Sequence, residues 1–170
     1  MGVTGCGKST LGRALAVALR LPFLEGDELH TAHNIAKMRA GQALDDADRA
    51  PWLDAIARQL RDRERFPAGV VLACSALKRA YRDRLRRASG VRFVFLAVPQ
   101  ALIEQRLRAR SGHFMPPSLI PSQFAALQPP TQDETDSVTI RAVDTPEATL
   151  LETLTALGFS ALRGEPRALE

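Results

Sequence analysis

The sequence predicts a single α/β domain built on a parallel β-sheet, and three observations support this prediction. Short apolar segments alternate with segments of helical periodicity along the 170 residues. Two apolar segments, residues 69–74 and 91–98, are continuous rather than alternating, which is typical of strands covered on both faces. The motif G-x-x-x-x-G-K-S at residues 2–9 stands directly before an amphipathic helix.

The first predicted elements have clear local signals. The first helix begins at Lys8 and shows apolar residues at helical spacing. The strand at residues 22–25 ends in a polar turn that contains Asp27. The helix at residues 34–40 stops at Gly41, which is a typical C-terminal cap.

The middle of the chain alternates in the same way. Three aspartates precede Pro51 and mark the start of a helix with an apolar stripe. The apolar strand at residues 69–74 leads into a basic helix at residues 77–87. The apolar strand at residues 91–98 leads into a helix at residues 99–110.

The last third of the chain completes the pattern. A loop at residues 111–117 leads into a helix at residues 119–127. A strand at residues 138–143 is followed by a last helix at residues 146–158. The polar tail at residues 159–170 is expected to be disordered.

The composition narrows the classes of function. No apolar run approaches the roughly 18 residues of a membrane span, and the chain shows no signal peptide, so we expect a cytoplasmic protein without a membrane partner. Cys6 and Cys74 are expected to be reduced thiols. The net charge is +4, but the arginines of residues 58–65 and 79–87 are interspersed with acidic residues, which is typical of solvated helix faces. We therefore expect no nucleic-acid partner.

The glycine-rich motif predicts a site for a nucleoside triphosphate. The backbone N–H groups of such a loop converge on phosphates, Lys8 reaches the β- and γ-phosphates, and the Ser9 hydroxyl binds Mg²⁺. The helix that follows presents an N-terminus that favours anions. The alternative is a glycine-rich turn that only caps a helix.

Asp27 is the best-placed carboxylate for phosphoryl transfer. Such a reaction needs a carboxylate near the acceptor hydroxyl, and Asp27 follows a predicted strand. Ser75 and Asp144 also fall at strand ends, where parallel sheets bind ligands. The alternative role of Asp27 is a turn or helix cap. His30 and His33 lack the further ligands that a zinc site requires.

Beyond the motif, the order of segments resembles the gluconokinase family, a group of small P-loop carbohydrate kinases related in fold to adenylate and shikimate kinases. The segments that carry the resemblance are Gly26-Asp27-Glu28-Leu29-His30, Asn34-Ile35-Ala36-Lys37-Met38, Pro51-Trp52-Leu53, Cys74-Ser75-Ala76-Leu77-Lys78-Arg79, Arg106 to Arg110 with Gly112-His113-Phe114, and Leu127-Gln128-Pro129. The resemblance implies one three-layer P-loop kinase domain at residues 1–158, with a lid around residues 106–118.

The resemblance also implies the reaction, which is transfer of the ATP γ-phosphate to the 6-hydroxyl of D-gluconate. It implies ATP and Mg²⁺ as cofactors and a possible homodimer. The implied catalytic residues are Lys8, Asp27, Arg106 and Arg110. The implied ATP-site residues are Gly2, Thr4, Gly5, Cys6, Gly7, Lys8, Ser9, Thr10, Arg106, Asp144 and Pro146, with Ser9 at the metal.

The acceptor pocket is expected to combine cations that bind the gluconate carboxylate with side chains that form hydrogen bonds with its hydroxyl groups. The implied residues are Asp27, His30, Asn34, Arg49, Lys78, Arg82, His113 and Gln123. Arg82 is the preferred bidentate partner of the carboxylate, and Arg49 is the alternative. Trp52 shares an apolar stripe and is expected in the core rather than in the pocket.

The sequence departs from the family pattern ahead of the phosphate loop. The family has an apolar strand there, central in the sheet order 2-3-1-4-5, and residues 1–9 contain no such strand. We therefore expect a sheet that is open between its third and fourth strands, with each unpaired backbone group costing about 1–3 kcal/mol. Either the start site is placed too far downstream, or the start is genuine and the protein is impaired.

Two alternatives to a gluconate kinase stay open at this point. One is another small-molecule kinase of the same fold, with shikimate or a nucleoside monophosphate as acceptor. The other is a non-enzyme: an inactive, N-terminally truncated chain that binds nucleotide weakly, or one that acts through its basic surface on nucleic acid.

Overall fold

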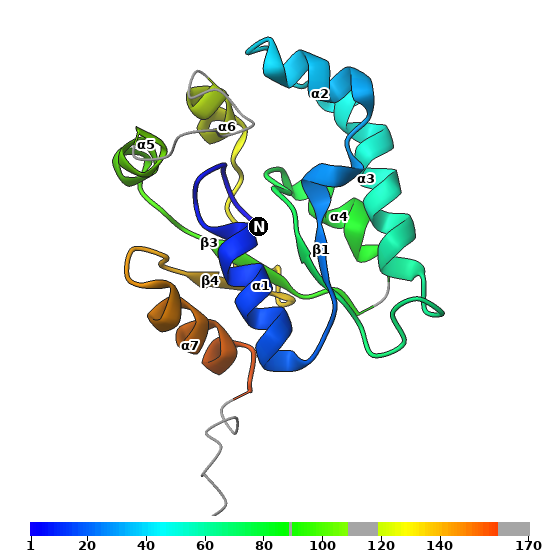
Figure 1. Cartoon of the computed structure of the whole chain (residues 1–170), viewed down its shortest axis with the longest axis vertical. Helices are drawn as coiled ribbons and strands as arrows, with labels where there is room; N and C mark the ends of the chain where they lie inside the picture. Colours follow the sequence, from blue (N-terminus) through cyan, green and yellow to red (C-terminus); the bar gives the residue numbers. More distant parts are fainter. Residues whose placement is uncertain (89, 109–118, 160–170) are drawn as a thin grey trace, which may run out of the picture.

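Helices surround short parallel strands near the centre of the molecule in the computed structural model, which describes residues 1–88, 90–108 and 119–159 (Figure 1). In chain order the elements are α1 (Lys8–Leu19), β1 (Phe23–Glu25), the 3₁₀ helix η1 (Gly26–Leu29), α2 (Ala32–Arg39), α3 (Asp46–Arg61), β2 (Val71–Ala73), α4 (Arg79–Arg86), β3 (Phe93–Leu96), α5 (Gln100–Arg108), α6 (Ile120–Ala126), β4 (Ser137–Ile140) and α7 (Pro146–Ala156). The predicted alternation of strands and helices is confirmed. The strands are shorter than the apolar runs, because each strand ends where its pairing with a neighbour ends.

The strands form two separate parallel pairs. β1 pairs with β2, with Phe23 opposite Val71, and β3 pairs with β4, with Phe93 opposite Ser137. In the described part of the chain, β2 and β3 are not paired with each other. The predicted opening in the middle of the sheet is therefore confirmed.

The first two residues of the chain bridge one end of this opening. The N–H of Gly2 donates to the carbonyl of Ser75 at 3.0 Å, and the N–H of Leu96 donates to the carbonyl of Met1 at 3.0 Å. The amino group of Met1 donates to the carbonyl of Val94. The N-terminus therefore lies at the centre of the molecule and pairs with both halves of the sheet (Figure 1).

A cavity of about 380 Å³ extends from Met1 along the opening. Its walls come from α1, β2 and β3 and are mostly apolar, with Leu15, Leu72, Phe93 and Val94 among the lining residues. The buried core forms two clusters: one joins the phosphate loop to β3, β4 and α5, and the other joins the end of β2 to α3, α4 and Phe93 of β3. β3 therefore contributes side chains to both clusters.

Local signals explain where the helices nearest the site begin. Asp45 caps α3: its carboxylate accepts from the N–H of Asp48, and the Asp48 carboxylate accepts in return from the N–H of Asp45. Pro51 lies inside α3 rather than at its start. Thr145 caps α7 in the same manner through the N–H of Ala148.

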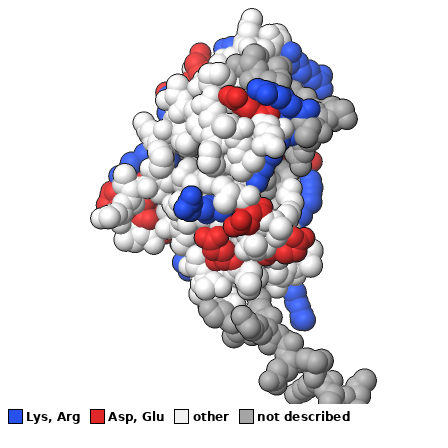
Figure 2. All heavy atoms as spheres, turned by 90° about the vertical axis from the view of Figure 1, so that its left-hand side faces the viewer, with Lys and Arg blue, Asp and Glu red and all other residues white. Residues whose placement is uncertain are grey.

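The four arginines of α4 are not a freely solvated face, which corrects the expectation for this segment. Each forms an ion pair with an acidic residue of another segment. A different face of the molecule, shown in Figure 2, likewise has basic and acidic side chains interspersed over a mainly uncharged surface. The pairs are Arg79 with Asp133, Arg82 with Glu134, Arg84 with Asp54 and Arg86 with Asp136.

None of the helices among the described residues has the length and apolar character needed to cross a membrane.

Candidate active site

The phosphate loop at residues 2–7 is a backbone structure that depends on glycine. Gly2, Gly5 and Gly7 have φ angles of +137°, +77° and +98°, a region that other residues rarely adopt. Gly7 immediately precedes α1, so the loop ends at the first N–H groups of this helix, which have no partner within the helix. Loop and helix together form a concave set of donors suited to phosphate oxygens.

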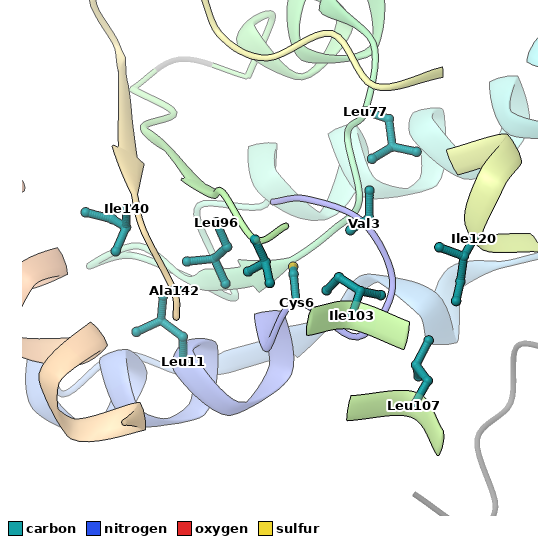
Figure 3. Packing of buried hydrophobic residues seen from close by; sticks show 11 residues of the cluster. Val3, Cys6, Leu11, Leu77, Leu96, Ile103, Leu107, Ile120, Ile140 and Ala142 are labelled. Carbon is teal, nitrogen blue, oxygen red and sulfur yellow. The ribbon is translucent and has the colours of Figure 1, made fainter. Parts of the chain in front are cut away.

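Apolar side chains anchor the loop to the core. Val3 and Cys6 are 3% and 1% exposed, and they point into a cluster with Leu96, Ile103 and Leu107 (Figure 3). The Cys6 thiol is therefore part of the packing. The backbone N–H of Cys6 donates to the carbonyl of Val3 at 3.4 Å.

Lys8 lies over the loop that precedes it. Its Nζ donates to the carbonyl of Val3 at 3.0 Å, and its side chain lines a cavity beside the loop. Ser9 and Thr10 follow in the first turn of α1, with Ser9 half-buried and Thr10 exposed. The predicted phosphate and metal residues therefore lie together at one end of α1.

The same cavity is lined by four of the predicted acceptor residues, namely Asp27, His30, Arg49 and Gln123. Thr4 and Lys8 line it from the phosphate loop, Asp27 and His30 from η1 and its end, and Arg49 from α3. Gln123 of α6 and Ser75 after β2 complete the polar part of the wall. Segments that are distant in sequence thus place a lysine, a carboxylate and a guanidinium on one cavity.

Gly26 decides where Asp27 lies. A Cβ at Gly26 would lie 2.5 Å from the carbonyl oxygen of Ala73, so only glycine permits the end of β1 to approach β2 so closely. The chain then turns into η1, with Asp27 as its second residue. Asp27 therefore lies in a 3₁₀ turn directly after the strand rather than in the strand itself.

His30 and Trp52 form one wall of the cavity. Their rings stack with centroids 4.3 Å apart and an angle of 11° between the planes. The Trp52 Nε1–H donates to the carbonyl of Gly26 at 2.7 Å. Burial lowers the pKa of His30, which favours the neutral ring. Trp52 is in the core as predicted, at 1% exposed, and it also lines the cavity, which the sequence analysis did not predict.

Asn34 supports this wall from behind, which corrects the expectation that it reads substrate hydroxyls. It is 1% exposed, and its Nδ2 donates to the carbonyl of Asp48 at 2.7 Å and contacts Nδ1 of His30 at 3.4 Å. Asn34 therefore joins α2 to α3 and holds the His30 ring. The sequence predicted that Asn34 lies near the site, but it did not predict the hydrogen bonds of its side-chain amide.

Gln123 connects α6 to the phosphate loop. Its Oε1 accepts from the N–H of Thr4 at 2.7 Å in a buried position. The residue that was expected to contact the acceptor is therefore also held against the loop that binds phosphate.

Arg82 is not in the cavity, which corrects its predicted role as the partner of a substrate carboxylate. Its side chain is 1% exposed and forms two hydrogen bonds with the Glu134 carboxylate, at 2.6 and 2.5 Å. It also donates to the carbonyl of Gln128 at 2.9 Å. Arg82 lowers the pKa of Glu134 to about 2, so this carboxylate stays ionised opposite it. The guanidinium joins α4 to the segment before β4.

We predict that Arg82→Met lowers the free energy of unfolding by about 3 kcal/mol, at the lower end of the range for a broken buried ion pair. The buried Glu134 carboxylate loses its two hydrogen bonds from Arg82, while Arg86 still pairs with it at 2.6 Å. Urea denaturation measures this change. The matched control is Arg84→Met, which removes a partly exposed pair with Asp54 and is expected to cost about 1 kcal/mol or less. Equal losses in the two variants would contradict the structural role of Arg82.

Lys78 lies at the edge of the cavity in a second, adjoining hollow of about 230 Å³. Its Nζ donates to both carboxylate oxygens of Asp46, at 2.6 and 2.8 Å. Arg49 lines both hollows, and in the described part of the chain it forms no ion pair with a carboxylate. Among the three described cations predicted for the pocket, Arg49 is the one whose charge is not matched by a protein carboxylate.

Three further residues predicted for the ATP site lie on or near a contact between α5 and the segment after β4. Arg106 of α5 donates to the carbonyl of Ala142 at 3.0 Å, just before the exposed residues Asp144 and Pro146. Arg110 and His113, predicted for the lid, lie outside the described residues.

A glycine-rich loop at a helix N-terminus, with its lysine on the same cavity as a carboxylate from a neighbouring strand end, defines a P-loop kinase. A family model described as an AAA domain matches residues 1–130. The chain is 48% identical to the gluconokinase of Gluconobacter oxydans over 135 residues, which cover 79% of this chain and 76% of that protein. The chain therefore belongs to the gluconokinase family.

Solved structures agree with this assignment. A gluconokinase from Sinorhizobium meliloti matches with a TM-score of 0.84 and 42% identity, over 94% of this chain and 89% of that chain. An unliganded sugar kinase from Janibacter sp. matches with a TM-score of 0.88 and 39% identity, over 94% of this chain and 92% of that chain. The predicted family, fold and enzyme class are confirmed.

Proposed function

We propose that this protein transfers the γ-phosphate of ATP to the 6-hydroxyl of D-gluconate and yields 6-phosphogluconate. The family supports this reaction, and the observation that carries it is one cavity lined by Lys8, Asp27 and Arg49. These residues supply a cation for the transferred phosphate, a carboxylate for the acceptor hydroxyl and a cation for the carboxylate of a sugar acid.

The donor set fits ATP with Mg²⁺. Backbone N–H groups of Gly5 and of residues 7–9 would hold the phosphates, and Lys8 would exchange its contact with the Val3 carbonyl for phosphate oxygens. Among the described residues no group of three or more His, Cys, Asp or Glu side chains could form a metal cage. This suits Mg²⁺, which prefers substrate phosphates and water with one or two protein ligands, here the Ser9 hydroxyl. Bound Mg²⁺ would neutralise charge that develops on the phosphates.

Asp27 would accept the proton of the 6-hydroxyl as the acceptor attacks phosphorus. This role is supported by the cavity that Asp27 lines together with Lys8 and Thr4 of the phosphate loop. The stacked rings of His30 and Trp52 would give the polyol chain a flat wall, and neutral His30 can donate or accept one hydrogen bond to a hydroxyl. The acceptor is thus oriented before transfer.

Arg49 is the cation that we assign to the gluconate carboxylate. Arg82 is buried against Glu134, and Lys78 is bound to both oxygens of Asp46. Arg49 lines both hollows, and its guanidinium offers the planar donors that match a carboxylate.

The remaining assignments are proposals that rest on the family resemblance. Arg106 and Arg110 would close over ATP from a lid around residues 106–118, and His113 would reach the acceptor. Asp144 and Pro146 would lie beside adenine. A single domain at residues 1–158, a cytoplasmic location and a homodimer stay predictions.

A coupled assay of ADP release with a panel of acceptors tests the proposal. We expect D-gluconate to exceed shikimate and AMP by about 100-fold or more in kcat/KM, since a site built around buried polar contacts rejects ligands that leave them unpaired. Lys8→Met is expected to lower kcat by about 100-fold or more, because a charge that stabilises the transferring phosphate is lost. No preference for gluconate, or full activity of Lys8→Met, would refute the proposal.

A further inference from the structure

Four polar residues join the first turns of α3 and α4 at the edge of the acceptor pocket. Asp46 and Arg49 are one turn apart on α3, and Lys78 and Tyr81 are one turn apart at the start of α4. We name these four residues the α3–α4 cluster. They combine one carboxylate with two cations, so the cluster itself has a net positive charge. Its three charged residues line the hollow together with Asp45.

Tyr81 is the centre of this cluster. It is the only tyrosine of the chain and is 6% exposed. Its hydroxyl donates to the Asp46 carboxylate and accepts from Nη1 of Arg49 at 3.4 Å. The same ring lies below both cations, with its centroid 5.8 Å from the Arg49 guanidinium carbon and 5.6 Å from Nζ of Lys78.

The directions of these hydrogen bonds follow from the donors and acceptors that the Tyr81 phenol has. A phenol has one proton and can accept with its oxygen lone pairs. Burial and the bond to Asp46 raise the pKa of Tyr81, while Lys78 and Tyr81 lower the pKa of Asp46. The phenol therefore keeps its proton and directs it to Asp46, which leaves its oxygen free to accept from Arg49.

We propose that Tyr81, fixed by Asp46, is a positioning residue that holds Arg49 toward the pocket and thereby sets the preference of the enzyme for sugar acids over neutral polyols. This inference rests on the proposed function. Lys78 is bound to Asp46, so the carboxylate of the acceptor meets Arg49, and the orientation of Arg49 decides how well an acid is distinguished from a neutral analogue.

The test combines Tyr81→Phe with Arg49→Met in a double-mutant cycle. Tyr81→Phe keeps the buried ring and removes the hydroxyl alone. We expect its Kd and KM for D-gluconate to rise about 10-fold, with kcat within about twofold and KM for ATP unchanged. The preference for D-gluconate over D-glucitol, the neutral polyol of the same length, is expected to fall by the same factor. In the Arg49→Met background the effect of Tyr81→Phe is expected to be less than about twofold.

Asp54→Asn is the matched control, because Asp54 and Arg84 join the same two helices away from both hollows. This variant is expected to leave Kd, KM and the acid preference unchanged. An equal effect of Tyr81→Phe with or without Arg49, or an equal effect of Asp54→Asn, would overturn the positioning role while the proposed function stands. Calorimetric titration of the unsubstituted protein with D-gluconate separates the two: if it neither binds nor phosphorylates gluconate, the proposed function fails and this inference with it.

Discussion

Asp27→Asn is expected to lower kcat by about 10²–10⁴-fold while KM for ATP changes little. Asparagine has nearly the same shape but cannot accept the proton of the acceptor hydroxyl. ATP contacts are expected to persist, because they come from the phosphate loop, which Val3 and Cys6 anchor independently of Asp27. The coupled assay at saturating ATP and gluconate measures kcat, and titration of each substrate measures the two KM values.

Glu28→Gln is the control for this prediction. Glu28 is the next residue of η1, is exposed, and does not line the acceptor cavity. It is expected to retain kcat within about twofold, as surface substitutions do. If Asp27→Asn retained the full kcat, Asp27 could not be the base, and its role would be that of a turn residue.

A short apolar N-terminal extension is expected to stabilise the protein strongly. Four valine or isoleucine residues placed before Met1 can enter the cavity of about 380 Å³ between β2 and β3 as a parallel strand. Each buried side chain contributes roughly 1.5–3 kcal/mol, and this is largely offset by the cost of ordering the residue. Hydrogen bonds to both edges then give a net gain on the order of 4 kcal/mol, or about 10 °C in Tm.

The pH dependence of the free energy of unfolding is a second measurement for this prediction, because it includes a contribution from the N-terminal amino group. Burial lowers the pKa of the Met1 amine from 8.0 to about 6. Between pH 6 and 8 the unfolded chain therefore binds more protons than the folded chain, so the free energy of unfolding rises with pH across this window. An extension converts the amine into a peptide N–H, and this contribution to the pH dependence is expected to disappear.

An extension of the same length made of Gly and Ser is the control. It also removes the amine at Met1, but it brings no apolar side chains, so its Tm is expected to rise far less. Scans at several protein concentrations exclude a gain from self-association. Equal Tm values for the two extensions would show that the cavity does not accept a strand.

The parts of the fold and site that the sequence predicted are those with local causes. Gly2, Gly5 and Gly7 have the left-handed φ angles that the motif requires, and the helix behind them begins at Lys8 as its periodicity predicted. Asp27 follows the predicted strand at residues 22–25, because Gly26 permits the close approach to β2. The signals that predicted these features lie within a few positions of one another, although the contact of Gly26 with Ala73 is a distant one.

The predictions that failed concern side chains whose partners are distant in sequence. Arg82 was expected to be a ligand for substrate, but its partner Glu134 is 52 positions away and no local pattern joins the two. Asn34 was predicted correctly to lie near the site, but its side-chain amide donates a hydrogen bond to the backbone carbonyl of Asp48. Tyr81 and Asp46 carried a weak signal, namely a single tyrosine one turn from a lysine of the predicted pocket.

The sequence by itself determined the phosphate loop and the alternating α/β order, because these follow from glycine positions and apolar periodicity, and its segments carried the resemblance to the family. Only the tertiary structure decided which cations remain available to a substrate. Burying a charge is costly unless it is paired, and Arg82 and Glu134 form an ion pair in the core. At the edge of the pocket, Lys78 forms an ion pair with Asp46. Arg49 lines the cavity and forms no ion pair with a carboxylate of the described residues, which supports its proposed role as the cation for the substrate.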